Sequence, residues 1–237
     1  MIDEKQLVQL VQNNQSIPVQ FADQRLLLDA EGVLYWPQCD LLIFSDLHFE
    51  KGSFLTQFAH PVPRYDSIDT LKRIQASIAR YKPSTVVCLG DSLHDVNAVK
   101  RMEDRLINHL NELISSVDEW CWVLGNHDPD IPESLFGLRM NFFTKNNLLL
   151  VHEFENLENH KDVNGQIIGH FHPKVSARIA MQKITGKCFL QDHKTIVMPA
   201  FGKYTGGLDL KNEAFSTILD KKNTKNFLMY NKKIYLV

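Results

Sequence analysis

The sequence predicts an α/β fold, arranged as a four-layer α/β/β/α sandwich in which two mixed sheets lie between flanking helices. Up to residue 124, apolar strand-like runs alternate with amphipathic helical segments, a pattern typical of βαβ units. From residue 138 onward, short apolar runs follow one another closely with little helix between them, which indicates a second sheet. The length of 237 residues fits one compact domain, and we expect residues 1–237 to form a single domain.

Periodicity predicts the elements of the first half. Fully apolar runs indicate strands buried on both faces, and apolar residues at three- and four-residue spacing indicate helices that begin near Asp66 and Asn97. The strands are predicted at 41–44, 85–89 and 120–124, and the helices at about 66–82 and 97–116.

The remaining segments read as short strands. Three apolar stretches within residues 1–35 predict peripheral strands, and residues 208–237 are expected to add a C-terminal strand extension. The strands of the second sheet are predicted at 138–143, 148–151, 166–168, 174–181, 187–190 and 195–198.

Composition limits the classes of function. The net charge of −2 argues against a protein that coats nucleic acid by bulk electrostatics. A nuclease stays open, because bound divalent metals supply the positive charge that a phosphate needs. The four cysteines lack the spacing of a zinc clip and are expected to be reduced. An acidic N-terminus unlike a signal peptide and the lack of a long apolar run predict a cytoplasmic protein that does not cross a membrane.

Polar residues follow the three buried strands at the point where each strand ends. Asp46 and His48 follow the first, Asp91 follows the second, and Asn126 and His127 follow the third. Because ligands bind where the carboxyl ends of strands meet in open α/β sheets, we expect these five side chains to converge.

Histidines of the second half extend this cluster. His152 ends an apolar run, and His170 and His172 are two residues apart after another, so both imidazoles project to the same side of an extended segment. Each motif alone is common in proteins without a metal. Burying all of these ionisable groups together would be costly without a metal or partner charges, and nitrogen and oxygen ligands suit Mn²⁺, Fe or Zn²⁺.

These motifs resemble the five blocks of the calcineurin-like metallophosphoesterase superfamily. Further blocks at 46–52, 61–66, 169–173 and 199–207 are similar to one branch, the ligase-associated DNA damage response endonucleases. The sequence departs from that branch at Ser92, where an apolar residue is usual.

The resemblance implies a role for each block residue. It implies that Asp46, His48 and His172 hold one metal, that Asn126, His152 and His170 hold the other, and that Asp91 bridges both. It further implies two divalent ions, with Mn²⁺ favoured over Fe or Zn²⁺, and attack on the phosphate by a hydroxide that they share. His127 resembles the residue that protonates the leaving oxygen.

Other residues have less specific interpretations. Asp128 is expected to orient His127, although capping of the turn before Pro129 explains it equally well. Candidate contacts to substrate are Lys51, Arg64, His94 and Lys203, each of which also fits an ordinary surface or loop residue. Aromatic residues at 49, 54 and 58 predict a short amphipathic helix.

Three functions therefore stay open. A nuclease acting on DNA, associated with a DNA ligase and a helicase, is the function that the branch implies. A phosphatase or phosphodiesterase of a small nucleotide or cyclic phosphate fits the mild acidity better. A non-catalytic metal-binding scaffold is the third possibility, and oligomeric state is not predicted.

Overall fold

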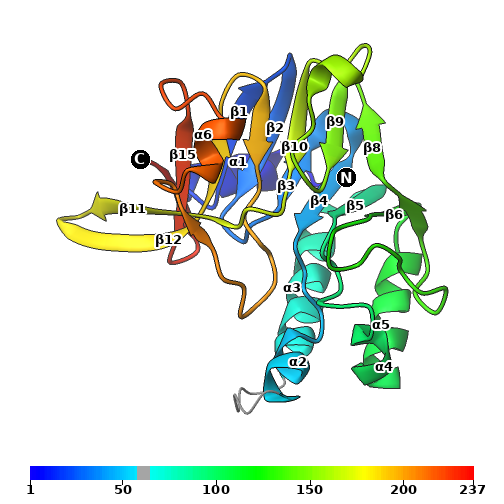
Figure 1. The fold of residues 1–237 in the computed structure, drawn as a ribbon. Coiled ribbons are helices and arrows are strands. Elements are labelled where there is room, and N and C mark those ends of the chain that lie inside the picture. Colours follow the sequence, from blue (N-terminus) through cyan, green and yellow to red (C-terminus); the bar gives the residue numbers. More distant parts are fainter. Residues whose placement is uncertain (58–64) are drawn as a thin grey trace.

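The structure is a computed structural model that describes residues 1–57 and 65–237. Its two mixed sheets lie face to face with helices on the outside (Figure 1), which confirms the predicted fold class. In chain order, the helices are α1 (Glu4–Gln12), α2 (Lys51–Gln57), α3 (Asp66–Tyr81), α4 (Ala98–Arg101), α5 (Asp104–Ser115) and α6 (Ala214–Ile218), with 3-10 turns η1 (Pro37–Cys39) and η2 (Leu157–Asn159).

The first sheet has the strand order β1-β2-β3-β4-β5-β6-β7. Pairing is antiparallel from β1 to β4 and parallel from β4 to β7. Its strands are β1 (Ser16–Phe21), β2 (Gln24–Asp29), β3 (Leu34–Trp36), β4 (Leu41–Ser45), β5 (Thr85–Leu89), β6 (Glu119–Val123) and β7 (Leu138–Met140).

The second sheet follows the order β14-β11-β12-β13-β10-β9-β8, and β15 pairs with both β12 and β16. Parallel pairs at its centre join β9, β10 and β13. Its strands are β8 (Phe142–Lys145), β9 (Leu148–Val151), β10 (Gly165–Ile168), β11 (Pro173–Ile179), β12 (Gln182–Gln191), β13 (Thr195–Val197), β14 (Leu208–Asp209), β15 (Lys225–Tyr230) and β16 (Lys233–Leu236).

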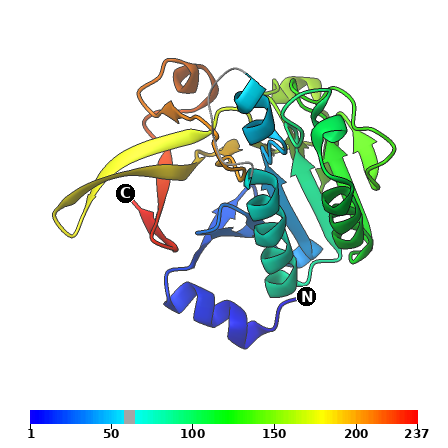
Figure 2. The same cartoon turned by 90° about the horizontal axis from the view of Figure 1, so that it is seen from below.

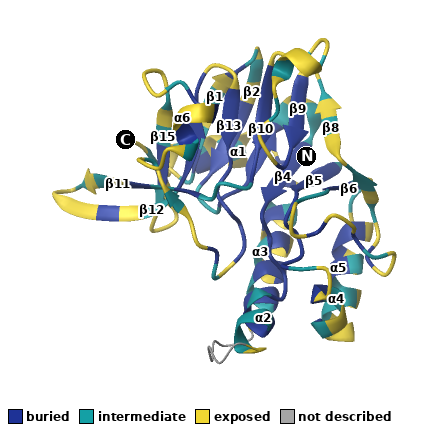
Figure 3. Cartoon of the chain, in the orientation of Figure 1, coloured by how far each residue is buried: buried dark blue, intermediate teal, exposed yellow. Residues whose placement is uncertain are grey.

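Three apolar clusters separate the four layers. One lies between the first sheet and the helices α1, α3 and α5, and the second lies between the two sheets. The third joins the outer face of the second sheet to α6, through residues such as Phe215. Figure 3 shows the central strands as buried over most of their length, whereas the outer part of the hairpin of β11 and β12, residues 176–185, is largely exposed. Burial on both faces explains why the central strands read as continuous apolar runs.

The structure differs from the sequence-based expectation at the N-terminus. Helix α1 precedes the strands and is capped by Asp3, whose side chain accepts a hydrogen bond from the Gln6 backbone. The strands of residues 1–35 belong to the first sheet, where Leu28 and Leu34 are fully buried. The helix spans only nine residues, and so short an apolar pattern does not distinguish a helix from a loop.

Two predicted elements are divided in the structure. The helix expected at 97–116 breaks at Met102, where the backbone is extended, into α4 and α5. The strand expected at 138–143 is β7 and β8, so the chain passes from the first sheet to the second at Asn141. The apolar pattern does not reveal this change of sheet, because Met140 before it and Phe143 after it both pack into the cluster between the sheets.

Among the described residues, no helix combines the length and the apolar character that crossing a bilayer requires.

Candidate metal centre

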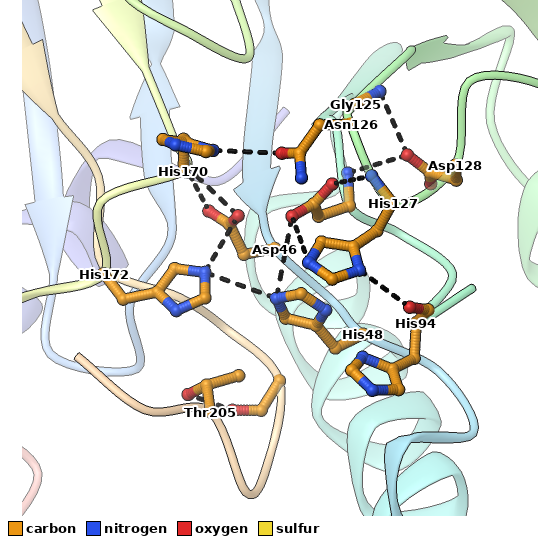
Figure 4. A network of polar contacts seen from close by, with 12 residues as sticks. Asp46, His48, His94, Gly125, Asn126, His127, Asp128, His170, His172 and Thr205 are labelled. Atoms are coloured by element: carbon orange, nitrogen blue, oxygen red, sulfur yellow. Dashed lines mark hydrogen bonds and ion pairs between the residues drawn. The ribbon is translucent and has the colours of Figure 1, made fainter. Parts of the chain in front are cut away.

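The polar residues predicted from the strand ends lie together at the carboxyl ends of the central strands (Figure 4). Asp46 follows β4, Asp91 follows β5 by one residue, and His152 follows β9 directly. Parallel strands from both sheets end at the same edge, and this brings segments more than a hundred residues apart into one cluster.

Asp46, His48 and His172 form the first group that could hold a metal ion. His172 Nε2 lies 3.0 Å from Asp46 Oδ1 and 3.3 Å from His48 Nε2. Asp46 and His48 are buried, and His172 is partly exposed. One carboxylate oxygen and two imidazole nitrogens thus point at a common position, as a divalent transition metal requires.

Asp91, His152 and His170 form the second group, and Asn126 lies within it. Asn126 Oδ1 is 3.0 Å from both His152 Nε2 and His170 Nδ1. His152 Nδ1 donates to the Leu89 carbonyl at 3.0 Å. This bond fixes the tautomer and leaves Nε2 free to bind a metal.

Asp91 lies between the two groups. One of its carboxylate oxygens is 3.3 Å from His152 Nε2, and the other is 3.9 Å from His48 Nε2. The structure therefore brings together all seven predicted ligands, and the placement of Asp91 suits a carboxylate shared by two metals.

The backbone at the candidate ligands adopts unusual conformations. Asp46, His48, Asp91, His170 and His172 all have positive φ, between 46° and 66°. Asp and His tolerate the left-handed region better than most side chains do, but it costs free energy and persists only where neighbours enforce it. Such conformations concentrate at functional sites, and here they mark five of the seven predicted ligands.

Close backbone approach explains two glycines beside the ligands. A Cβ at Gly90, where φ is +61°, would lie 2.3 Å from His152 Nδ1, and one at Gly169 would lie 2.2 Å from Ser45 Oγ. Any side chain at either position would displace a candidate ligand or its neighbour.

Electrostatics keep most of the donors ready to bind a cation. Burial lowers the pKa of His48 to about 3, and burial together with His152 lowers the pKa of His170, so both rings are neutral. Burial opposes ionisation of Asp46, but the His172 hydrogen bond and the neighbouring histidines outweigh it and lower its pKa. Neutral imidazoles and ionised carboxylates are the forms that bind metals.

His152 behaves differently in the metal-free protein. Burial lowers its pKa, but the hydrogen bond to Asp91 and the charge of Asp46 outweigh burial and raise it to about 9. A cation bound at His152 Nε2 would displace this proton, because only the neutral imidazole binds a metal. The donor set fits a metal pair: two buried carboxylates, four imidazoles and an amide oxygen converge on two positions.

His127 lies beside these groups without belonging to either. Its ring is 43% exposed, and Nε2 is 4.0 Å from Asp91 Oδ2. Its Nδ1 donates to the His94 carbonyl at 3.0 Å, which directs Nε2 toward the cluster. This placement suits a proton donor better than a ligand.

Asp128 does not orient His127, and that expectation needs correction. Its carboxylate accepts backbone hydrogen bonds from Gly125, Asp91 and Leu93 at 2.9–3.0 Å. Asp128 is fully buried and faces backbone, because the turn that carries it folds over the loop after β5. The orienting contact comes from the His94 carbonyl, so the alternative of turn capping is the better description.

The candidate substrate contacts are spread around the centre. The predicted aromatic helix matches α2 only in part. Phe54 lies in α2 and packs its ring 4.7 Å from that of His94, Phe49 precedes α2 and forms a β-bridge with Leu93, and residue 58 lies outside the described residues. Burial lowers the pKa of Lys51, whose charge is attracted to Asp91 and Asp46. Lys203 pairs with Asp69 at 3.5 Å. Arg64 lies outside the described residues.

Sequence reasoning missed two cations that hold the segment 199–208 against the centre. Arg73 donates to the Phe201 carbonyl at 2.7 Å, and Lys187 donates to the carbonyls of Ala200 and Gly202 at 2.6 and 2.9 Å. The Gly202 N–H in turn donates to the Asp46 carbonyl at 3.0 Å. Nothing in the sequence reveals backbone partners of this kind.

Two mixed sheets with a cluster of carboxylates and imidazoles at their shared edge define the class of protein to which this chain belongs. A model of the calcineurin-like phosphoesterase family matches residues 40–223, and the chain belongs to that family.

A solved structure of 22% identity shares the fold. A Pseudomonas putida nuclease named MPE superposes with a TM-score of 0.70 at 22% identity, over 94% of this chain and 100% of that one. An Aquifex aeolicus protein of unknown function, AQ665, gives a TM-score of 0.40 at 16% identity, over 56% and 78%. A comparison with curated proteins gave no significant match.

Proposed function

We propose that this protein is a phosphodiesterase dependent on two divalent metal ions and that its substrate is DNA. The observation that carries the proposal is the pair of donor groups on either side of Asp91. The Pseudomonas putida protein of the same fold is a nuclease, which supports the substrate class, as do the sequence blocks at 61–66 and 199–207.

Different residues of the centre have different roles in the proposed reaction. Asp46, His48 and His172 would hold one cation, Asn126, His152 and His170 the other, and Asp91 both. Cations held there supply Lewis acidity toward a phosphate and acidify water. His127 donates a proton to the leaving oxygen through Nε2, while the His94 carbonyl holds its Nδ1 proton.

The exposure of the centre is compatible with a polymer substrate. His127 and His170 have side chains that are 43% and 35% exposed, whereas Asp46 and Asp91 are buried behind them. The chemistry is therefore reachable from solution on one side and supported by protein on the other.

Turnover of bis-p-nitrophenyl phosphate against p-nitrophenyl phosphate, with Mn²⁺, Fe²⁺ or Zn²⁺ added to the metal-free protein, tests the reaction. We expect diester hydrolysis that requires metal, and nicking of supercoiled plasmid in the same buffer. Activity on monoesters or cyclic nucleotides alone would indicate that the substrate is a small phosphate ester and not DNA. Failure on every ester with both metals loaded would indicate a binding scaffold.

Mn²⁺ as the native metal, the cytoplasmic location and association with a DNA ligase and a helicase stay predictions. Metal analysis of protein purified without added metal, and co-purification from the native cell, test them.

A further inference from the structure

The hairpin of β11 and β12 projects from the body of the molecule and begins at the metal centre (Figures 1 and 2). His172, a candidate ligand, is followed directly by Pro173, the first residue of β11. The two strands pair antiparallel from Lys174 opposite Lys187 to Ile179 opposite Gln182. At about 3.3 Å per residue, Arg178 lies roughly 20 Å along the strand from His172.

The two faces of this hairpin differ in chemistry. Alternation and register place polar side chains on one face, which we call the basic face, and apolar ones on the other. The apolar side chains of Val175 and Ile184 pack into the cluster that contains Phe215. The basic face consists of Lys174, Ser176, Arg178, Lys183, Thr185 and Lys187.

Like charges oppose one another near the tip of the basic face. Arg178 pairs with Lys183, and like charges directly across a ladder destabilise a sheet. At the base, Lys174 lies opposite Lys187, whose ammonium donates to two backbone carbonyls. Residues 173–191 contain no acidic side chain. Asp209, which pairs with Lys174 at the base of the hairpin, accepts a hydrogen bond from the Lys211 backbone. An anion bound along this face would relieve the repulsion.

Contacts at its base show that the basic face lies on the side of the metal centre. Lys187 donates to the Gly202 carbonyl, and the Gly202 N–H donates to the Asp46 carbonyl. A Cβ at Gly207 would lie 2.6 Å from both Lys174 Cε and the His172 carbonyl. The base of the face is therefore linked through one loop to Asp46 and His172.

We propose that the basic face of the β11–β12 hairpin binds the sugar–phosphate backbone of the DNA strand that leaves the metal centre. This inference rests on the proposed action on DNA. Arg178 and Lys183 are exposed near the tip and would bind phosphates beyond the one that is cleaved. From Lys174 to Arg178 the strand spans about 13 Å, or roughly four base pairs at 3.4 Å each.

Nucleic acid fits this face better than a lipid surface does. Membrane-binding elements expose several apolar side chains beside their cations, whereas Val175 and Ile184 are buried and Met181 is the one large apolar side chain exposed in residues 173–191. The face also carries hydroxyls between its cations, at Ser176 and Thr185, which are hydrogen-bonded to each other at 2.6 Å. Hydroxyls and cations together are the usual contacts to a phosphate backbone.

The test compares the full-length protein with the variant Arg178→Gln/Lys183→Gln. Binding of a fluorescein-labelled 20-base-pair duplex to the metal-loaded protein is followed by anisotropy between 50 and 200 mM KCl, with His127→Ala present in both proteins so that binding is measured apart from turnover. Losing two phosphate contacts should lower the slope of log K against log[salt] by about 2, and should weaken binding roughly tenfold more at 50 mM than at 200 mM. The kcat/KM for bis-p-nitrophenyl phosphate, measured with His127 in place, should not change, because this ester is too small to reach the tip.

Two further variants separate charge at this site from charge in general. Lys5→Gln/Arg25→Gln removes the same two charge types from exposed positions on α1 and β2 and should leave the salt slope unchanged. Arg178→Lys/Lys183→Arg keeps the charges and should bind as the unmodified protein does. Urea unfolding of each variant should show no loss of stability, since the neutral pair removes a like-charge contact.

The outcomes separate this inference from the proposed function. A duplex affinity and salt slope equal to those of the unmodified protein would overturn the role of the hairpin and leave the esterase activity standing. Ester hydrolysis without any duplex binding would overturn it as well. Hairpin-dependent duplex binding without hydrolysis of any ester would support it while the proposed catalysis fails.

Discussion

At the scale of single residues, substitution of His127 tests proton transfer to the leaving oxygen apart from metal binding. Its ring lies outside both donor groups, and Nε2 is 4.0 Å from Asp91 Oδ2. We expect His127→Ala to lower kcat by about 10²–10⁴, the usual contribution of a general acid, while the protein keeps two equivalents of metal. Metal analysis beside steady-state kinetics checks this, and loss of one equivalent would make His127 a ligand.

Asp128 supports the backbone of the centre, and its two oxygens have different partners. Oδ1 accepts from Asp91 and Gly125, and Oδ2 accepts from Leu93. Asp128→Asn keeps one oxygen for the first two bonds but places an amide donor against the Leu93 N–H. We expect a loss of about 1–3 kcal/mol in unfolding free energy, measured by urea denaturation.

Kinetic measurements on Asp128 variants distinguish support of the backbone by Asp128 from orientation of the His127 ring by Asp128. Asp128→Ala, which removes all three acceptors, should be less stable than Asp128→Asn and should bind metal more weakly. Full stability in Asp128→Asn together with a large drop in kcat would restore the orienting role for Asp128.

The candidate metal ligands can be predicted from the sequence because apolar runs indicate where the buried strands end. Each of Asp46, Asp91 and Asn126 follows an apolar run, and convergence at one sheet edge follows from parallel topology. The partners of Asp128 cannot be predicted in this way. Two of its three donors, the backbone N–H groups of Asp91 and Leu93, are 37 and 35 residues away in the chain, and a backbone donor carries no sequence signature.

At the scale of elements, the segment 199–208 connects the hairpin to the metal centre. Burial, with Arg73 and Lys174 nearby, lowers the pKa of Lys187 to about 7, against about 10.4 for an unfolded lysine. Between these values the unfolded state binds more protons, so this group makes stability rise with pH from about 7 to 10. Below pH 7 both states are protonated and the cost of the buried charge is fully present.

Lys187→Met should remove that pH dependence. The unfolding free energy of the unmodified protein minus that of Lys187→Met should increase as pH rises through 7 to 10 and stay constant below about pH 6. Urea titrations at half-unit pH steps measure it, with Lys183→Met, at an exposed position of the same strand, as the control. A difference that falls over this range would mean that the two carbonyl acceptors keep Lys187 charged.

Element boundaries show where sequence patterns lose information. The bounds predicted for the buried strands β4, β5 and β6 agree with the structure to within about a residue, since burial on both faces leaves a continuous apolar run. Across the junction of β7 and β8 the pattern indicates one strand, because Met140 and Phe143 contribute to one cluster although they lie in different sheets. Long-range pairing decides such a boundary, and periodicity within one segment does not record it.

At the scale of the whole molecule, the donor groups join the two sheets. Asp46 and Asp91 follow strands of the first sheet, and His152, His170 and His172 follow strands of the second. Cations bound between them would therefore link the sheets, as well as offset two buried carboxylates.

Metal should then stabilise the fold and not only activate it. A ligand that binds only the native state adds about 2.7 kcal/mol at a free concentration of 100 times its Kd, so EDTA should lower Tm by several degrees, and Mn²⁺ should restore it. Asp91→Asn weakens the shared ligand and should lose most of the shift, whereas Asn126→Ala touches one group and should keep part of it. Scanning calorimetry with and without EDTA measures these shifts, and equal shifts in Asp91→Asn and the unmodified protein would contradict a metal pair that depends on Asp91.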